Sequence, residues 1–321
     1  MTSDADPEVV VVRQKIHGMD ARGLYSTLRE RLGAGRVHLA DTRARELELV
    51  PQAAMAVGYG LPEEILDAPG ALRVFACSFA GVGHLDLERF RTADVVVTNA
   101  AGVHAPNITE QVIGAMLYFS RRFDIAVGQQ RSRVWQSYPP GELAGADAVV
   151  IGMGAIGTRV CEMLQHFDVE VTGVRHTPEK GGPAGAVVGY DDRAAIDAAV
   201  AAAEFVIIAA PLTEKTRGFI DGQRLLTMRS DAVLINVGRG PIVDTDALVS
   251  ALRSNAIGGA AVDVTDPEPL PASHPLWSFE NVLITPHNSG ATPRYWDRMA
   301  DIVETNLRRL TEGEQLRNRV S

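Results

Sequence analysis

The stretch VVIGMGAIGTRV, residues 149–160, decides the fold of this chain. It places three glycines directly after an apolar run and ahead of a segment with helical spacing. In a strand–turn–helix unit, Gly152 permits the tight turn, Gly154 lets the backbone approach a pyrophosphate, and Gly157 lets the helix pack closely on the strand. The free N–H groups at the start of such a helix attract phosphate. The stretch therefore predicts a unit that binds a dinucleotide.

The segment VTGVRHTP, residues 171–178, indicates which dinucleotide is preferred. NAD-specific sites carry an acidic residue about 20 residues into the motif, where it accepts hydrogen bonds from the ribose hydroxyls. This chain has Arg175 at that place, followed by His176 and Thr177, which can also donate hydrogen bonds. An arginine attracts a 2′-phosphate that a carboxylate repels. We therefore expect NADP(H) as the preferred cofactor, with NAD(H) still usable.

Two alternatives to this interpretation stay open. Arg175 could point into solvent above the adenine, since an arginine can also stack on a base. The unit could also bind an adenosyl ligand as methyltransferases do, although such a site would favour an acidic residue after the second strand.

The composition is that of a two-domain globular protein. The chain has 321 residues, 46% of them hydrophobic and 22% charged, and no apolar run approaches the roughly 20 residues needed to cross a bilayer. The net charge of −9 argues against nucleic acid as the main partner, although it allows one local basic pocket. The acidic N-terminus lacks the features of a signal peptide. We expect a cytoplasmic protein without a membrane span or metal site, in which Cys77 and Cys161 are buried thiols.

Apolar runs alternate with amphipathic segments along the chain, as in parallel sheets with crossover helices. In the first part of the chain, strands are expected at 9–12, 55–58, 72–77 and 94–98, with helices at 24–32 and 63–68. In the second part, strands are expected at 147–151, 169–174, 205–210, 232–237, 258–264 and 282–285. The pattern predicts an α/β fold with two units in tandem.

Two helices are expected at the junctions between these units. Asn107 can cap a long linking helix, and Glu110 can complete its capping box. The apolar positions of this helix are Val112, Met116, Phe119 and Phe123. The last helix is expected to open at Thr292 with Pro293 in its first turn, and to return to the first unit because no strand follows it.

Three ionisable residues follow expected strands, at the edge where open α/β sheets bind ligands. LINVGRGPIVD brings Arg239, AAVDVTDPEPL brings Glu268, and VLITPHNSG brings His287. Each residue alone has a structural explanation. Arg239 could lie in a solvated turn, Glu268 could face water, and His287 could make hydrogen bonds only within the fold. Together they give a cation, a carboxylate and an imidazole beside the nucleotide loop. Those are the groups that reversible carbonyl reduction requires.

The chain resembles the D-isomer-specific 2-hydroxyacid dehydrogenase family over most of its length. Six motifs carry the resemblance in order: SFAGVGHLDL (78–87), GMGAIG (152–157), APLTEKTRGFI (210–220), LINVGRGPIVD (234–244), DVTDPEPL (263–270) and TPHNSGAT (285–292). The resemblance implies two Rossmann-like or flavodoxin-like domains with parallel sheets and an interdomain cleft. A discontinuous substrate domain, 1–100 plus 289–321, would accompany a dinucleotide-binding domain, 101–288. It also implies a homodimer.

By the same resemblance, Arg239, Glu268 and His287 are the catalytic residues of a 2-keto acid reductase. Arg239 would hold the substrate carboxylate and polarise the carbonyl. His287 would protonate the carbonyl oxygen while the nicotinamide delivers hydride to C2, and Glu268 would orient the imidazole and favour its protonated form. The family's carboxylate-binding loop corresponds to the backbone N–H groups of Ala80, Gly81 and Val82. Expected cofactor contacts besides the three glycines are Ala155, Ile156, Arg175, His176, Thr177, Pro211, Thr216, Val237, Gly238, Asp263 and His287.

A dinucleotide-sensing corepressor has the same fold and even the same three residues, and it stays the alternative to an enzyme. Within the family, Glu268 speaks against formate dehydrogenases, which carry glutamine there. The chain also ends too soon after His287 for the regulatory domain of some phosphoglycerate dehydrogenases. Trp135, Tyr295 and Trp296 are assigned to core or dimer packing rather than to the substrate pocket. No pattern in the sequence selects one 2-keto acid.

Overall fold

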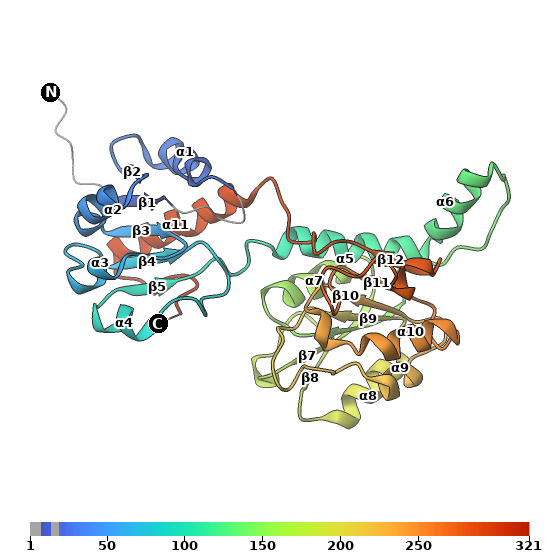
Figure 1. The fold of residues 1–321 in the computed structure, drawn as a ribbon. Coiled ribbons are helices and arrows are strands. Elements are labelled where there is room, and N and C mark those ends of the chain that lie inside the picture. The colour runs from blue at the N-terminus through green and yellow to red at the C-terminus, as the bar shows by residue number, and fades with distance from the viewer. Residues whose placement is uncertain (1–7, 14–18, 321) are drawn as a thin grey trace. The chain divides into compact units, whose positions relative to one another are not determined.

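The computed structural model describes residues 8–13 and 19–320, and its internal contacts divide the chain into two units (Figure 1). Unit 1 comprises Met1–Val103 and Thr292–Ser321, and unit 2 comprises His104–Ala291. The sequence-based boundaries were 1–100 plus 289–321 for one domain and 101–288 for the other.

Unit 1 is a parallel sheet of five strands covered by helices on both faces. Its strands are β1 (Val9–Val12), β2 (Val37–Ala40), β3 (Met55–Gly58), β4 (Val74–Cys77) and β5 (Val96–Thr98), in the order β2-β1-β3-β4-β5. This is the flavodoxin-like order. Alternate residues of each central strand enter two separate apolar cores. Helices α1 (Ala21–Leu32) and α11 (Tyr295–Glu312) cover one face, and α2 (Arg43–Leu49), α3 (Glu63–Asp67) and α4 (Leu87–Thr92) cover the other.

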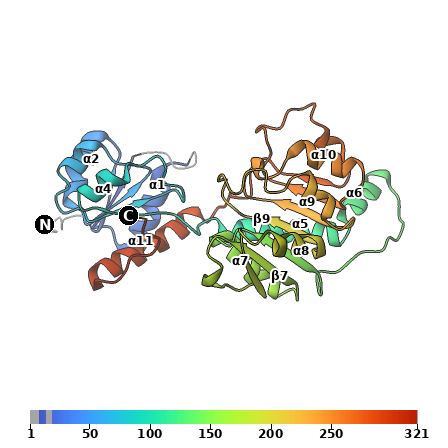
Figure 2. The same ribbon diagram turned by 90° about the horizontal axis from the view of Figure 1, so that it is seen from below.

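Unit 2 is a parallel sheet of seven strands. They are β6 (Asp147–Ile151), β7 (Glu170–Arg175), β8 (Ala186–Gly189), β9 (Phe205–Ile208), β10 (Val233–Asn236), β11 (Gly259–Val262) and β12 (Val282–Ile284). Their order, β12-β11-β10-β9-β6-β7-β8, is that of doubly wound dinucleotide-binding folds with one strand added. Helices α5 (Ala105–Ser120) and α7 (Ala155–Gln165) cover one face, and α8 (Arg193–Ala202), α9 (Gly222–Thr227) and α10 (Thr245–Arg253) cover the other, as Figure 2 also shows.

The predicted fold class is confirmed, because both sheets are parallel and each expected strand is present within three residues of its expected ends. Two strands were not predicted, β2 and β8. Both lie at sheet edges and include half-buried residues, so they lack the continuous apolar run that marks a central strand.

The predicted start of the linking helix is wrong. Helix α5 begins at Ala105 with His104 as its N-cap residue, and a proline in its first turn fits this earlier start. Asn107 therefore lies inside the helix and is not its N-cap residue, so the capping box expected with Glu110 does not stand at the helix start. The helix also ends before Phe123, which belongs to the separate helix α6 (Phe123–Ser132) and is 48% exposed.

The predicted start of the last helix is also wrong. Helix α11 begins at Tyr295, with Arg294 as its N-cap residue. The Oγ1 atom of Thr292 accepts a hydrogen bond from the Arg294 N–H at 3.2 Å, so Thr292 and Pro293 form a turn ahead of the helix. The helix packs into the core of unit 1 through its buried face.

The remaining packing predictions have mixed outcomes. Cys77 and Cys161 are free and buried as expected, and burial raises the pKa of the Cys161 thiol to about 12. Tyr295 is a core residue and Trp296 packs against the same core, whereas Trp135 is fully exposed. None of the helices in the described part of the chain has the length and apolar character needed to cross a bilayer.

Candidate active site

The glycine loop after β6 has the steric requirements that its sequence predicts. Gly152 has φ +98°, a value that side chains rarely adopt, and a Cβ there would lie 2.6 Å from the Ala210 Cα. A Cβ on Gly157 would lie 1.9 Å from the Gly152 carbonyl oxygen, so helix α7 packs directly on the turn. Gly154, in contrast, has no protein atom within 4 Å of where its Cβ would be. The space beside Gly154 is therefore open to a ligand.

Helix α7 presents its N-terminus to that space. Gly154 is its N-cap residue and makes no side-chain capping hydrogen bond, and no acidic residue lies in the first turn. The first N–H groups of a helix have no partner within the helix and carry a partial positive charge. The loop and the helix start thus fit the pyrophosphate of a dinucleotide.

A pocket of about 260 Å³ lies beside this loop in unit 2. Seven of the expected cofactor residues line it: Gly152, Gly154, Arg175, His176, Thr177, Pro211 and Thr216. Four residues that sequence reasoning missed line it as well: Met153, Tyr190, Thr213 and Lys215. Of these, Lys215 is a second permanent cation besides Arg175. It lies within the motif APLTEKTRGFI (210–220), where its positive charge was the signal that could have singled it out.

Arg175 is held in place at the end of β7. Its Nη1 donates a hydrogen bond to the Gly181 carbonyl oxygen at 2.5 Å, which ties the guanidinium to the following loop. Gly181 has φ +58° and can therefore turn the chain back towards the arginine. The half-buried guanidinium lines the pocket rather than pointing away from it.

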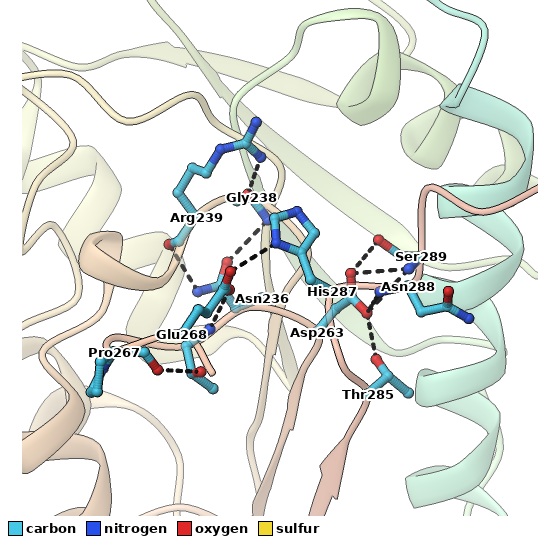
Figure 3. A network of polar contacts seen from close by, with 11 residues as sticks. Asn236, Gly238, Arg239, Asp263, Pro267, Glu268, Thr285, His287, Asn288 and Ser289 are labelled. Atoms are coloured by element: carbon cyan, nitrogen blue, oxygen red, sulfur yellow. Dashed lines mark hydrogen bonds and ion pairs between the residues drawn. The ribbon is translucent and has the colours of Figure 1, made fainter. Parts of the chain in front are cut away.

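The expected catalytic residues come from the loops that follow β10, β11 and β12, three adjacent strands (Figure 3). Arg239 follows β10 in a turn shaped by the buried Asn236, whose Oδ1 accepts from the Gly238 N–H at 3.0 Å and whose Nδ2 donates to the Arg239 carbonyl oxygen at 3.1 Å. The next residue, Gly240, leaves no room for a side chain, because a Cβ there would lie 2.0 Å from the Thr265 carbonyl oxygen. The arginine turn therefore packs against the loop that carries Glu268.

Glu268 links that loop to His287. Its Oε1 accepts a hydrogen bond from the Thr265 N–H at 3.0 Å, and its Oε2 lies 2.9 Å from the His287 Nδ1. Since an ionised carboxylate can only accept, Nδ1 carries the proton of this hydrogen bond. Among the described residues the His287 Nε2 has no partner, and Arg239 pairs with no carboxylate. The structure thus brings the three predicted residues together. One imidazole nitrogen is left for a ligand, and the Arg239 guanidinium donates through Nη1 to the Gly238 carbonyl oxygen at 2.6 Å, which leaves its other N–H groups for a ligand.

Asp263, which follows β11, organises the segment that carries His287. Its side chain is buried, and its carboxylate accepts hydrogen bonds from the Thr285 Oγ1 at 2.6 Å, the Asn288 N–H at 2.8 Å and the N–H and Oγ of Ser289 (Figure 3). The Asp263 carbonyl oxygen also accepts from the His287 N–H at 2.7 Å. These contacts hold His287 at φ +51°, a conformation uncommon for residues with a side chain.

Helix α5 supports the same segment from the other side. The Nδ2 of Asn107 donates to the Ser289 carbonyl oxygen at 2.5 Å, and the Nε2 of Gln111 donates to the Thr285 Oγ1 at 3.2 Å. Asn107 thus makes a tertiary contact with the segment after β12, whereas the sequence suggested that it caps the helix.

The remaining expected site residues lie in two places. Val237 and Gly238 precede Arg239 in its turn, and Ala155 and Ile156 form the start of α7. In unit 1, the loop after β4 carries Ala80, Gly81 and Val82. It is fixed by the Asn99 Nδ2, which donates to the Ala80 carbonyl oxygen at 2.7 Å.

Comparison with known proteins gives consistent matches. A family model described as "D-isomer specific 2-hydroxyacid dehydrogenase, NAD binding domain" matches residues 113–289, more than half of the chain. A protein named glyoxylate reductase from Thermofilum pendens is 34% identical over 257 residues, which are 78% of this chain and 75% of the relative. The glyoxylate reductase/hydroxypyruvate reductase of Homo sapiens is 31% identical over 263 residues, 79% of each chain.

A solved structure agrees with these relatives. A D-isomer specific 2-hydroxyacid dehydrogenase from Xanthobacter autotrophicus Py2, in complex with NADPH and MES, superimposes with a TM-score of 0.77 and 28% identity. The match covers 99% of this chain and 98% of the other.

The buried carboxylate of Asp263 generates a prediction about stability. In Asp263→Asn, an amide nitrogen replaces one acceptor oxygen and faces hydrogen-bond donors, so we expect a loss of about 1–3 kcal/mol in the free energy of unfolding. Urea unfolding followed by circular dichroism measures it. Asp266→Asn, in the exposed part of the same loop, is the matched control and should unfold like the wild type. Equal midpoints for the two variants would contradict the role given to Asp263.

Proposed function

The chain belongs to the D-isomer-specific 2-hydroxyacid dehydrogenase family and is an oxidoreductase that uses a nicotinamide dinucleotide; from this premise we propose that it reversibly reduces a small 2-keto acid to the D-2-hydroxy acid. Unit 2 is the proposed dinucleotide-binding domain and unit 1 the substrate domain. The observation that carries the proposal is the hydrogen bond between His287 and Glu268. The loop that carries Glu268 also packs against the turn that carries Arg239.

Each of the three residues has a chemical task that follows from its geometry. Arg239 binds the carboxylate of the keto acid with its planar donors and polarises the carbonyl, which draws electron density from C2 towards the oxygen. His287 gives the proton of Nε2 to that oxygen as charge develops on it, and Glu268 holds Nδ1 so that Nε2 faces the substrate. When bound, the nicotinamide supplies the hydride that reduces C2. The backbone N–H groups of Ala80, Gly81 and Val82 are a proposed second anchor for the carboxylate.

NADP(H) is the proposed preferred cofactor, with NAD(H) as a usable substitute. Arg175 supports this preference, because its guanidinium lines the pocket beside the glycine loop at the place where NAD-specific sites carry a carboxylate. The relative from Xanthobacter autotrophicus was solved with NADPH. Glyoxylate and hydroxypyruvate are the first substrates to assay, because two relatives are named as reductases of these compounds.

A homodimer is the proposed assembly, and α6 is its proposed contact. This helix has no buried residue and projects from the end of α5 away from the sheet (Figure 1). Four apolar side chains are exposed on it and just after it: Phe123, Val127, Val134 and Trp135. An isolated helix of 10 residues with a solvent-exposed apolar face is marginal in water, so a second copy of the chain that covers it would stabilise it. The two buried free thiols are consistent with the proposed cytoplasmic location.

His287→Ala tests the reaction assigned to the site. We expect turnover of glyoxylate or hydroxypyruvate to fall by about 10²–10⁴-fold, the usual contribution of a positioned acid, while the fold stays intact by circular dichroism. His166→Ala, at the C-cap of α7, is the matched control and should keep full activity. Steady-state assays of nicotinamide oxidation measure both. A fully active His287→Ala enzyme would disprove the assignment.

Arg175→Asp tests the cofactor preference. An aspartate repels the 2′-phosphate and can accept from a ribose hydroxyl, so the ratio of kcat/KM for NADPH to that for NADH should fall by about 100-fold, the value of one or two charge-assisted hydrogen bonds. Arg193→Asp, at the first position of α8 and outside the pocket, controls for the change in net charge. The preference fails if wild type uses both cofactors equally well or if Arg175→Asp leaves the ratio unchanged.

Trp135→Ser tests the assembly. Removing a large apolar anchor should raise the dissociation constant of the dimer by at least about 30-fold. Analytical ultracentrifugation over a concentration series measures it. Trp277→Ser, which removes a half-exposed tryptophan outside α6, should leave the dimer intact. A wild-type monomer, or equal dissociation constants for both variants, would refute the proposal.

A further inference from the structure

The pocket beside the glycine loop contains a lysine that the cofactor motif does not explain. Lys215 lines this pocket together with Arg175, and it stands in the loop that follows β9. This loop is fixed by its two threonines: the Thr216 Oγ1 donates to the Pro211 carbonyl oxygen at 2.6 Å and accepts from the Thr213 N–H at 2.8 Å. The backbone of Lys215 is therefore in a defined place.

The strand order places Lys215 and Arg175 on either side of the glycine loop. In the sheet, β6 lies between β9 and β7, so the loops after β9 and β7 flank the loop after β6. This is the point where the strand order reverses, and it is where doubly wound sheets bind their ligands. An anion that enters the pocket beside Gly154 would therefore meet one cation from each side.

Lys215 has a partner that a stronger anion can replace. Its Nζ lies 3.1 Å from the Asp191 Oδ1, but the side chains of Lys215 and Asp191 are 53% and 89% exposed. Ion pairs this exposed contribute little to stability, because both groups are well solvated and long side chains lose entropy when fixed. A phosphate monoester carries nearly two negative charges and three acceptor oxygens. It would compete successfully with a solvated carboxylate for the ammonium group.

A single guanidinium carries one positive charge and balances only about half of the charge of such a phosphate. One nitrogen of Arg175 is already used by the Gly181 carbonyl oxygen, which leaves the other N–H groups to face the ligand. His176 is exposed beside it and carries charge only when protonated. A second permanent cation on the opposite side would balance the remaining charge.

We propose that Lys215 is a second ligand of the 2′-phosphate of NADP(H), opposite Arg175, and that Asp191 is the counter-ion that Lys215 leaves when the phosphate binds. The inference rests on the proposed preference for NADP(H). Lys215 then strengthens the discrimination against NAD(H), which offers no phosphate to it. Asp191 weakens that discrimination, because it competes for the ammonium group and adds negative charge near the phosphate.

The test compares dissociation constants, measured by calorimetry on the full-length protein, for NADPH, NADH and the fragments 2′,5′-ADP and 5′-AMP. Lys215→Gln should bind NADPH and 2′,5′-ADP about tenfold more weakly, the loss of one charge-assisted hydrogen bond, and NADH and 5′-AMP nearly as wild type. Asp191→Asn should lower the dissociation constants of NADPH and 2′,5′-ADP, with NADPH bound about threefold more tightly. Lys215→Arg should keep most of the NADPH affinity.

Lys180→Gln is the matched control. It removes the same charge from an exposed position in the loop after β7, outside the pocket. Equal effects of Lys215→Gln and Lys180→Gln on NADPH would overturn the proposal, because they would show only a general effect of net charge. Equal weakening of NADPH and NADH by Lys215→Gln would also overturn it, since the lysine would then contact a part that both cofactors share. The NADP(H) preference itself is tested separately by Arg175→Asp. That variant can shift the cofactor ratio as expected even if Lys215→Gln leaves the binding of NADPH unchanged.

Discussion

The geometry of the candidate active site depends on the buried carboxylate of Asp263. A charge removed from water is costly unless it is fully hydrogen-bonded, so Asp263 and the donors of the segment after β12 must come together when unit 2 folds. The contact between His287 and Glu268 is half-exposed and could not fix the segment alone. The buried network therefore sets where the imidazole stands, and Glu268 selects which of its nitrogens faces outward.

Features with local steric causes could be predicted from the sequence. The glycines at 152 and 157 are required by contacts within one strand–turn–helix unit, so the spacing alone identifies them. Central strands show as continuous apolar runs because both of their faces are buried. The half-buried edge strands β2 and β8 lack that pattern, and the start of α5 was misplaced because Asn107 makes a tertiary contact that imitates a capping residue in sequence.

That the three candidate residues lie close together was predictable from the sequence, but the contacts that position them were not. Residues that follow adjacent parallel strands meet at one edge of a sheet, which is enough to bring Arg239, Glu268 and His287 together. The left-handed backbone of His287 and the turn shaped by Asn236 arise from contacts between residues distant in sequence. Asp263 was expected at the cofactor, a role that stays a prediction, and the hydrogen bonds that its buried carboxylate accepts from backbone and hydroxyl donors could not be predicted from the sequence.

The net charge of −9 and a pocket built for an anion are compatible because they act over different distances. At physiological salt the field of exposed charges decays within about 8 Å, so most of the acidic surface is screened from a ligand already in the pocket. Within that distance, the side chains lining the pocket decide the outcome: Arg175 and Lys215 are cationic, and none of the lining residues is acidic. Under the proposal for Lys215, the affinity for a phosphorylated dinucleotide would depend on the local balance between these two cations and Asp191, and much less on the charge of the whole chain.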